Sequence, residues 1–143
     1  MQTVYFKKLN EDARIPEYQT ENSVGIDFHS VENGSIDVGK FKVIGTGLAV
    51  QMTGNLELQV RSRSGLAAKS GVFIMNGIGT IDPDYRGEIK LILLNMGERT
   101  FTFKKGDRLA QGVFSEKPLI DIQEVDDLEE TERGDGGLGS TGK

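Results

Sequence analysis

The sequence contains no cysteine and a single histidine, His29, among its 143 residues. Without cysteine the chain cannot form a disulfide, a thiolate metal site or a thiolate nucleophile, and one histidine cannot build a histidine-rich zinc site. Any metal must therefore be bound through oxygen. This requirement points to Mg²⁺, which is usually held by substrate phosphates, water and one or two carboxylates.

Long apolar runs are also missing, and no segment has the length needed to span a bilayer. The first eight residues, Met1 to Lys8, lack the apolar region of a secretory signal. The net charge of −5 disfavours general binding to nucleic acid, because that affinity comes from accumulated lysine and arginine. We expect a cytoplasmic protein that binds neither membrane nor nucleic acid. A small anionic ligand held by a few basic groups is compatible with this composition.

Helical periodicity is absent over any long segment, whereas short β-rich runs alternate with turn residues. Nineteen glycines, in turns such as Asn33-Gly34, fit a closed or two-sheet antiparallel architecture. The pattern predicts an all-β fold, a jelly-roll-like antiparallel barrel or sandwich, with one short helical turn within 66–71. The predicted strands are 4–6, 41–44, 56–60, 88–94, 101–103 and 119–122.

The composition changes at Asp126, first to an acidic run and then to a glycine-rich end. We expect a β-rich core over 1–125 and an acidic linker with a flexible glycine-rich arm over 126–143. The arm has two interpretations, an inert disordered end or a lid that orders over a ligand. Residues 137–143 match the start of a P-loop, but the strand and helix that flank a P-loop are absent here. The glycine-rich backbone can still direct N–H groups toward a polyphosphate.

Two further segments and Asn76 carry polar groups suited to a nucleotide. Residues 61–67 place two arginines and two hydroxyls where a strand gives way to a loop, which suits phosphate oxygens; a solvated strand end is the alternative. In residues 79–87, Asp82 can act as a general base and Tyr85 can offer a flat face to a sugar or base. The alternative is a hairpin turn that begins at Asp82-Pro83. Asn76 can read a base edge through its amide, or can simply form a turn with Gly77.

Five segments in order resemble the motifs of the trimeric deoxyuridine triphosphatase (dUTPase) family: 24–28, 63–67, 79–87, 106–111 and 133–142. The resemblance implies a jelly-roll subunit in a homotrimer, with active sites at subunit interfaces and the arm closing over a neighbour's site. It implies Mg²⁺-assisted hydrolysis of dUTP to dUMP and pyrophosphate by in-line attack of water on the α-phosphate. Such an activity keeps uracil out of DNA and supplies dUMP for thymidylate synthesis.

The resemblance also assigns roles to residues around the nucleoside. Asp82 takes the position of the carboxylate that orients and deprotonates the attacking water. Tyr85 packs under the deoxyribose and excludes a 2′-hydroxyl, while Asn76 and the backbone at Gly79 and Ile81 read the uracil edge.

Other residues take the positions of phosphate contacts. Arg63, Ser64 and Gly65 meet the phosphate chain, Gln111 meets the α-phosphate, and Asp27 corresponds to the carboxylate that holds metal-bound water. In the arm, the γ-phosphate contacts correspond to Arg133, Gly139, Ser140 and Thr141. Leu138 stands where the family usually has an aromatic that stacks over uracil, which forgoes on the order of 1 kcal/mol of stacking.

Three other functions are compatible with parts of the sequence. A deoxycytidine triphosphate deaminase shares the implied fold, but Tyr85 and the Arg63-Ser64-Gly65 loop argue against it. A nucleotide-binding regulatory protein would act through a partner; the intact Asp82 argues against loss of catalysis, and a second, partner-binding role stays open without being predicted. The third is a general nucleoside triphosphate pyrophosphatase, which a substrate panel would separate.

Overall fold

Short antiparallel strands make up most of the computed structural model, which describes residues 2–138. Within this range the one α-helix has seven residues, and no helix is long and apolar enough to cross a membrane. In chain order the elements are β1 (Val4–Lys8), β2 (Ile26–His29), β3 (Gly34–Ile36), β4 (Phe41–Gly45), β5 (Leu48–Met52), β6 (Leu56–Arg61), α1 (Ser64–Ser70), β7 (Val72–Ile74), β8 (Gly79–Ile81), β9 (Lys90–Asn95), β10 (Phe101–Phe103) and β11 (Arg108–Glu116).

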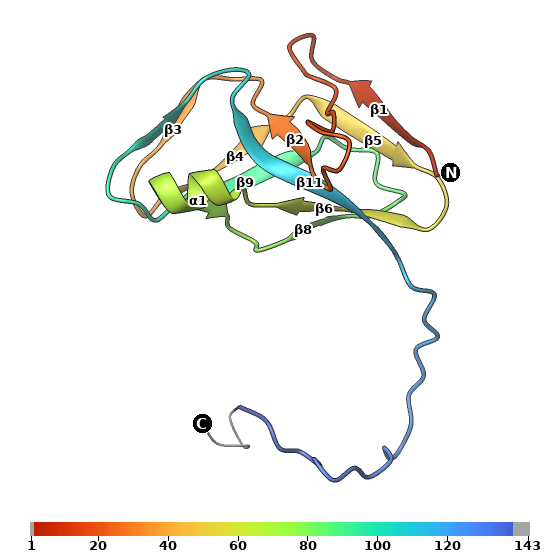
Figure 1. Ribbon diagram of the computed structural model, residues 1–143. Helices are drawn as coiled ribbons and strands as arrows, with labels where there is room; N and C mark the ends of the chain where they lie inside the picture. Colours follow the sequence, from red (N-terminus) through yellow and green to blue (C-terminus); the bar gives the residue numbers. More distant parts are fainter. Residues whose placement is uncertain (1, 139–143) are drawn as a thin grey trace.

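The strands form four antiparallel groups. The largest has the order β2-β11-β6-β8, a second has the order β4-β9-β7, and β1-β5 and β10-β3 are pairs. Neighbours in these groups are often distant in sequence, as in the pairing of β2 with β11. Figure 1 shows the strands gathered in one body from which the chain after β11 leaves as an extended tail. The predicted all-β, jelly-roll-like architecture is confirmed.

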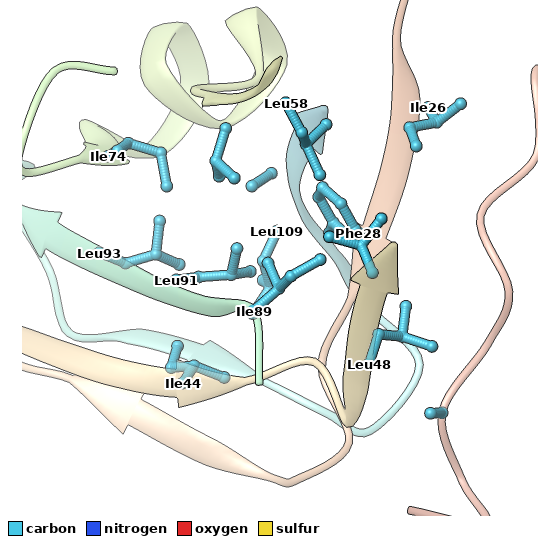
Figure 2. Packing of buried hydrophobic residues seen from close by; sticks show 14 of the residues in the cluster. Ile26, Phe28, Ile44, Leu48, Leu58, Ile74, Ile89, Leu91, Leu93 and Leu109 are labelled. Carbon is cyan, nitrogen blue, oxygen red and sulfur yellow. The ribbon is translucent and has the colours of Figure 1, made fainter. Parts of the chain in front are cut away.

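A single core lies between the sheets and follows from the two-residue alternation of the strands. In β6 the residues Leu56, Leu58 and Val60 are buried while the residues between them are partly exposed. Figure 2 shows Leu58 close to Phe28 of β2 and the leucines of β9 directed toward the same interior. Phe28 and Leu58 are both fully buried, so replacing Leu58 with Ala should cost about 2–5 kcal/mol.

β6 is the strand that positions the candidate site, because it pairs with β11 on one side and β8 on the other. At its carboxyl end the chain continues through Ser62 and Arg63 into α1, which ends at Gly71 in the left-handed conformation (φ 65°). Toward its amino end Leu58 pairs with Ile81, so the residues after β8 lie at the opposite end of β6 from α1.

The sequence prediction failed at the end of the core. Residues 119–122 form no strand, and within residues 117–138 the structure has neither strand nor helix. Leu119 and Ile122 are 88% and 90% exposed. The segment has a β-rich composition but no neighbouring strand in the described part of the chain, and an unpaired strand is not stable by itself.

Candidate active site

Asp27, in the middle of β2, is held between two arginines. Its carboxylate oxygens lie 3.1 Å from Arg63 Nε and 3.2 Å from Arg108 Nη1. Asp27 is only 9% exposed, and a buried charge requires a partner of opposite sign. The two guanidinium groups compensate the carboxylate, and the carboxylate in turn fixes both arginine side chains.

Arg63 is fixed by its backbone as well. It stands in extended conformation (φ −95°, ψ 126°) at the junction of β6 and α1. Its Nη1 donates to the backbone carbonyl of Arg108 at 3.1 Å. The guanidinium therefore has defined contacts on two atoms before any ligand binds.

Gln111 lies opposite Asp27 across the β2–β11 pair. Its Nε2 donates to the carbonyl of Ser62 at 2.9 Å. A Cβ on Gly25 would lie 2.5 Å from Gln111 Oε1, which is closer than such contacts allow. Gly25 is thus needed for the present position of Gln111, a requirement that the sequence alone did not reveal.

These residues surround a hollow of about 400 Å³. The structure brings together five residues predicted from sequence at this hollow. Its lining residues are Ser23, Val24, Gly25, Asp27, Arg63, Ser64, Gly65 and Gln111.

Asp82 and Tyr85 belong to a tight turn after β8. The amide of Tyr85 donates to the carbonyl of Asp82 at 3.1 Å, with Pro83 at the second position, where its fixed φ suits such a turn. Tyr85 donates its hydroxyl to the carbonyl of Glu88 at 3.0 Å, and a Cβ on Gly87 would overlap that hydroxyl. The segment therefore forms the expected turn and also leaves the Asp82 carboxylate exposed, so the two interpretations of its sequence do not conflict. Gly87 leaves room for the Tyr85 side chain.

Asn76 lies in the turn between β7 and β8 and is exposed. The turn is closed by two backbone hydrogen bonds, one from Gly77 to Ile74 at 3.1 Å and one from Ile78 to Asn76 at 2.9 Å. Gly77 has a φ of 74°, a conformation that glycine adopts without strain. Within residues 2–138 no hydrogen bond from the Asn76 side chain holds this turn, so the side chain can meet a ligand.

One chain does not bring Asp82 to the phosphate-suited hollow. The β6–β8 register pairs Ile81 with Leu58, which places Asp82 level with Glu57, six residues before Arg63. Six residues of extended chain span roughly 20 Å. The predicted site is therefore divided into two sets, one around Asp27 and Gln111 and the other on the segment from Asn76 to Tyr85.

The arm residues form a third set. Arg133 Nε donates to the carbonyl of Gly136 at 2.9 Å, and Leu138 is fully exposed with a φ of 48°. Neither lines the hollow. Gly139, Ser140 and Thr141 lie outside the described residues.

His29 lies two residues after Asp27 on β2 and was not part of the predicted site. Burial lowers the pKa of His29, and the positive charges of Arg14, Arg108 and Arg63 add to this effect, with Asp27 opposing it. His29 stands opposite Arg108 in the β2–β11 register. The imidazole is therefore held toward its neutral form beside the Asp27 cluster.

Oxygen ligands for a metal are sparse in the same region. In residues 2–138 no three carboxylate or histidine side chains come together as a metal cage. Asp27 uses one contact on each oxygen for an arginine, and a carboxylate has about four acceptor positions. Its remaining positions can accept hydrogen bonds from water around a hydrated ion.

Comparison with known proteins places this geometry in context. A family model described as dUTPase matches residues 11–142. The deoxyuridine 5′-triphosphate nucleotidohydrolase of Nautilia profundicola is 51% identical over 137 residues, covering 96% of each chain. The Staphylococcus bacteriophage 80alpha dUTPase with dUPNHPP superposes with a TM-score of 0.90 at 26% identity and covers 99% of both chains. The D95N mutant dUTPase of phage phi11 of S. aureus, described with a structural Mg(II) ion, has a TM-score of 0.80 at 25% identity over 90% of this chain and 99% of its own.

Proposed function

The chain belongs to the dUTPase family and is a dUTP diphosphatase, and we propose that it forms dUMP and pyrophosphate by Mg²⁺-assisted, in-line attack of water on the α-phosphorus. The observation that carries the mechanism is the hollow where Arg63 and Gln111 converge beside the Asp27 carboxylate. We place the activity in keeping uracil out of DNA and in supplying dUMP for thymidylate synthesis.

The phosphate chain binds in this hollow. Arg63 is already oriented by Asp27, and charge-assisted hydrogen bonds from a fixed guanidinium are among the stronger contacts to phosphate. Ser64 and Gly65 offer a hydroxyl and an unobstructed backbone beside it, and Gln111 contacts the α-phosphate. Fixing these donors before binding reduces the ordering that the substrate must impose.

The chemistry takes place at the turn after β8. Asp82 orients the attacking water and accepts its proton, for which an exposed carboxylate on a tight turn is accessible. The hydrogen bond from Tyr85 to Glu88 fixes the ring, so that its face packs under the deoxyribose and leaves no space for a 2′-hydroxyl. Asn76, with the backbone of Gly79 and Ile81, reads the uracil edge.

A bound Mg²⁺ would neutralise charge on the triphosphate and make pyrophosphate a better leaving group. The residues present fit an ion carried mainly by the phosphates, because the described chain offers no cage and Asp27 keeps acceptor positions for water. Asp27 would then hold the ion through water while it continues to orient Arg63.

A complete site needs more than one copy of the chain, and we assign the assembly as a homotrimer with sites at subunit interfaces. The separation of roughly 20 Å along β6 leaves Asp82 too far from Arg63 to act on a phosphate in the same hollow. A hollow from one subunit and a turn from another would complete the site.

The outer face of the β4-β9-β7 sheet supports this assembly. Phe41 and Val43 of β4 are 56% and 50% exposed, and they pair in register with Leu94 and Ile92 of β9. Phe73 pairs with Leu94 from the other side. Residues paired in register share a face of the sheet, so this is a continuous apolar surface, which in a monomer would be unfavourable to leave in water.

The arm completes the proposal. Beyond β11 the exposed apolar side chains of the extended segment, including Leu119 and Ile122, are available to a neighbouring subunit. Arg133 and the residues Gly139, Ser140 and Thr141 would close over the γ-phosphate there, while Leu138 covers the uracil by dispersion.

A substrate panel tests the function. The protein with Mg²⁺ is incubated with dUTP, dTTP, dCTP and UTP, and pyrophosphate and ammonia are measured. Pyrophosphate from dUTP alone is expected. Release from all four would indicate a general pyrophosphatase, and ammonia from dCTP would indicate a deaminase.

A further inference from the structure

A second cavity, of about 680 Å³, lies between the N-terminal segment and the start of β11. Three cationic side chains line it, those of Lys8, Arg14 and Arg108, against one carboxylate, that of Glu17. The whole protein carries a net charge of −5, so this is a local concentration of the opposite sign. We propose that this cavity binds a phosphate group, either free or at the end of a small ligand.

Arg14 is the cation most available to such a ligand. Among residues 2–138 it takes part in none of the ion pairs. Its guanidinium lies against the backbone of Gly106, where a Cβ would come within 2.7 Å of Arg14 Nη2. The side chain is thus placed by packing and keeps its donors for an oxyanion, a geometry that guanidinium recognises well.

His29 lines the same cavity and carries an unsatisfied group. In the described part of the chain its Nδ1 is buried and has no hydrogen-bond partner. Buried polar atoms without a partner are uncommon and call for an explanation. Rotation of the imidazole toward the cavity would let an oxygen ligand supply the missing partner.

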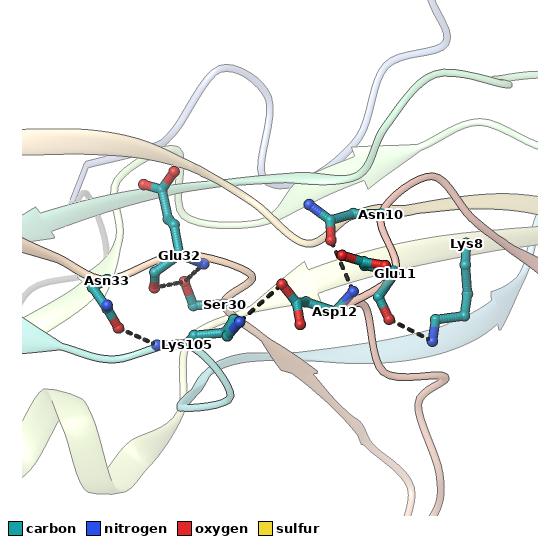
Figure 3. A network of polar contacts seen from close by, with 8 residues as sticks. All are labelled: Lys8, Asn10, Glu11, Asp12, Ser30, Glu32, Asn33 and Lys105. Atoms are coloured by element: carbon teal, nitrogen blue, oxygen red, sulfur yellow. Dashed lines mark hydrogen bonds and ion pairs between the residues drawn. The ribbon is translucent and has the colours of Figure 1, made fainter.

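The segment that contributes Lys8 and Arg14 is tied in place. Lys8 Nζ donates to the carbonyl of Glu11 at 3.0 Å, and the Asp12 carboxylate pairs with Lys105 Nζ at 2.9 Å. Figure 3 shows both contacts, of which the pair between Asp12 and Lys105 joins the N-terminal segment to the turn before β11. Because the wall of the cavity is already ordered, little conformational entropy is lost when an anion binds.

The cavity adjoins the substrate hollow through one ion pair. Arg108 lines the cavity and its Nη1 contacts Asp27 at 3.2 Å, while Asp27 lines the hollow. An experiment must therefore separate a phosphate bound beside Arg14 from one bound beside Arg63. The single histidine makes this possible, because His29 alone gives imidazole NMR signals.

The test titrates the full-length protein with inorganic phosphate at constant pH and ionic strength and follows the His29 signals. We expect a saturable shift in wild type and in Arg63→Gln, and a dissociation constant raised about tenfold or more in Arg14→Gln and in Lys8→Gln. Lys7→Gln is the matched control, since Lys7 precedes Lys8 on β1 and projects from the other face of the strand.

The control should stay within about twofold of wild type, because it makes the same charge change outside the cavity. A parallel titration of Arg63→Gln with dUMP identifies the source of the group. Because dUMP is also the reaction product, only dUMP binding that Arg14→Gln weakens is assigned to the cavity. Such binding, if tighter than that of phosphate, indicates a phosphate on a nucleotide, and weaker binding indicates a free ion.

Three results would overturn the proposal. One is a shift that never saturates, another is equal binding by wild type and Arg14→Gln, and the third is loss of binding in Arg63→Gln. The last would place the anion in the substrate hollow.

Discussion

Replacing Asp27 with Asn removes a charge that two arginines share, with almost no change in side-chain size. Asp27 and Arg63 are 12% and 27% exposed at the side chain, and their contact of 3.1 Å is largely shielded from water. Arg108, in contrast, is 48% exposed. The substitution should therefore act mainly through Arg63.

The magnitude follows from these exposures. A hydrogen bond to a charged group contributes about 1.5–3 kcal/mol when shielded, and an exposed pair such as that with Arg108 contributes at most about 1 kcal/mol. Asparagine still accepts one hydrogen bond, so we expect the free energy of unfolding to fall by about 2 kcal/mol. Arg63 also loses its anchor on Nε, which should raise KM for dUTP about tenfold.

Denaturant unfolding and steady-state kinetics measure the two effects. Protein concentration must be fixed, because the stability of an assembly depends on it. Asp121→Asn is the control, since Asp121 is exposed in the tail and, among the residues described, accepts a side-chain hydrogen bond only from its near neighbour Gln123, at 2.6 Å. If Asp27→Asn matched the control in both stability and KM, the carboxylate would not organise the hollow and the argument from its ion pairs would fail.

Four further predictions test other parts of the proposal. Asp82→Asn should lower kcat by at least ~10²-fold while calorimetry shows nearly unchanged binding of a non-hydrolysable dUTP analogue; wild-type turnover would remove Asp82 from the mechanism. Chelating divalent ions should abolish pyrophosphate release without changing the melting temperature, because the ion is carried by the substrate, and loss of both together would indicate a structural metal. Deleting 133–143 should leave the assembly and its melting unchanged while turnover falls sharply, and full activity would show that this end is inert. Because the pKa of His29 is lowered in the folded protein, the unfolded chain binds more protons than the folded chain at pH values between the folded pKa and 6.5. The contribution of His29 to the free energy of unfolding should therefore be greatest above pH 6.5 and fall as the pH decreases through that range. Denaturant titrations of His29→Asn should lack this dependence on pH.

The sequence by itself determined much of the local structure and the identity of the candidate residues. Alternation in 56–60 predicted a strand with a buried face, and β6 has that face because the alternation of side chains is a property of the extended backbone. The turn at Asp82-Pro83 could also be predicted from local sequence, because proline fixes its own φ. Family motifs then identified Arg63 and Gln111, which the fold places at one hollow.

Sequence reasoning failed where a partner distant in the chain decides the outcome. The segment Ile26–His29 was not predicted as a strand, because it carries a buried carboxylate that is tolerable only beside the guanidinium groups of Arg63 and Arg108, both distant in sequence. The prediction of a strand over 119–122 was wrong for the converse reason, since this segment has suitable composition but no strand to pair with among residues 2–138.

Only the tertiary structure decided how the candidate residues are distributed in space. Asp82 and Arg63 are close in sequence, yet antiparallel pairing of β6 with β8 carries them to opposite ends of one strand. Local sequence determines which groups a segment offers, whereas strand register determines the distance between them, and register depends on contacts made across the whole fold.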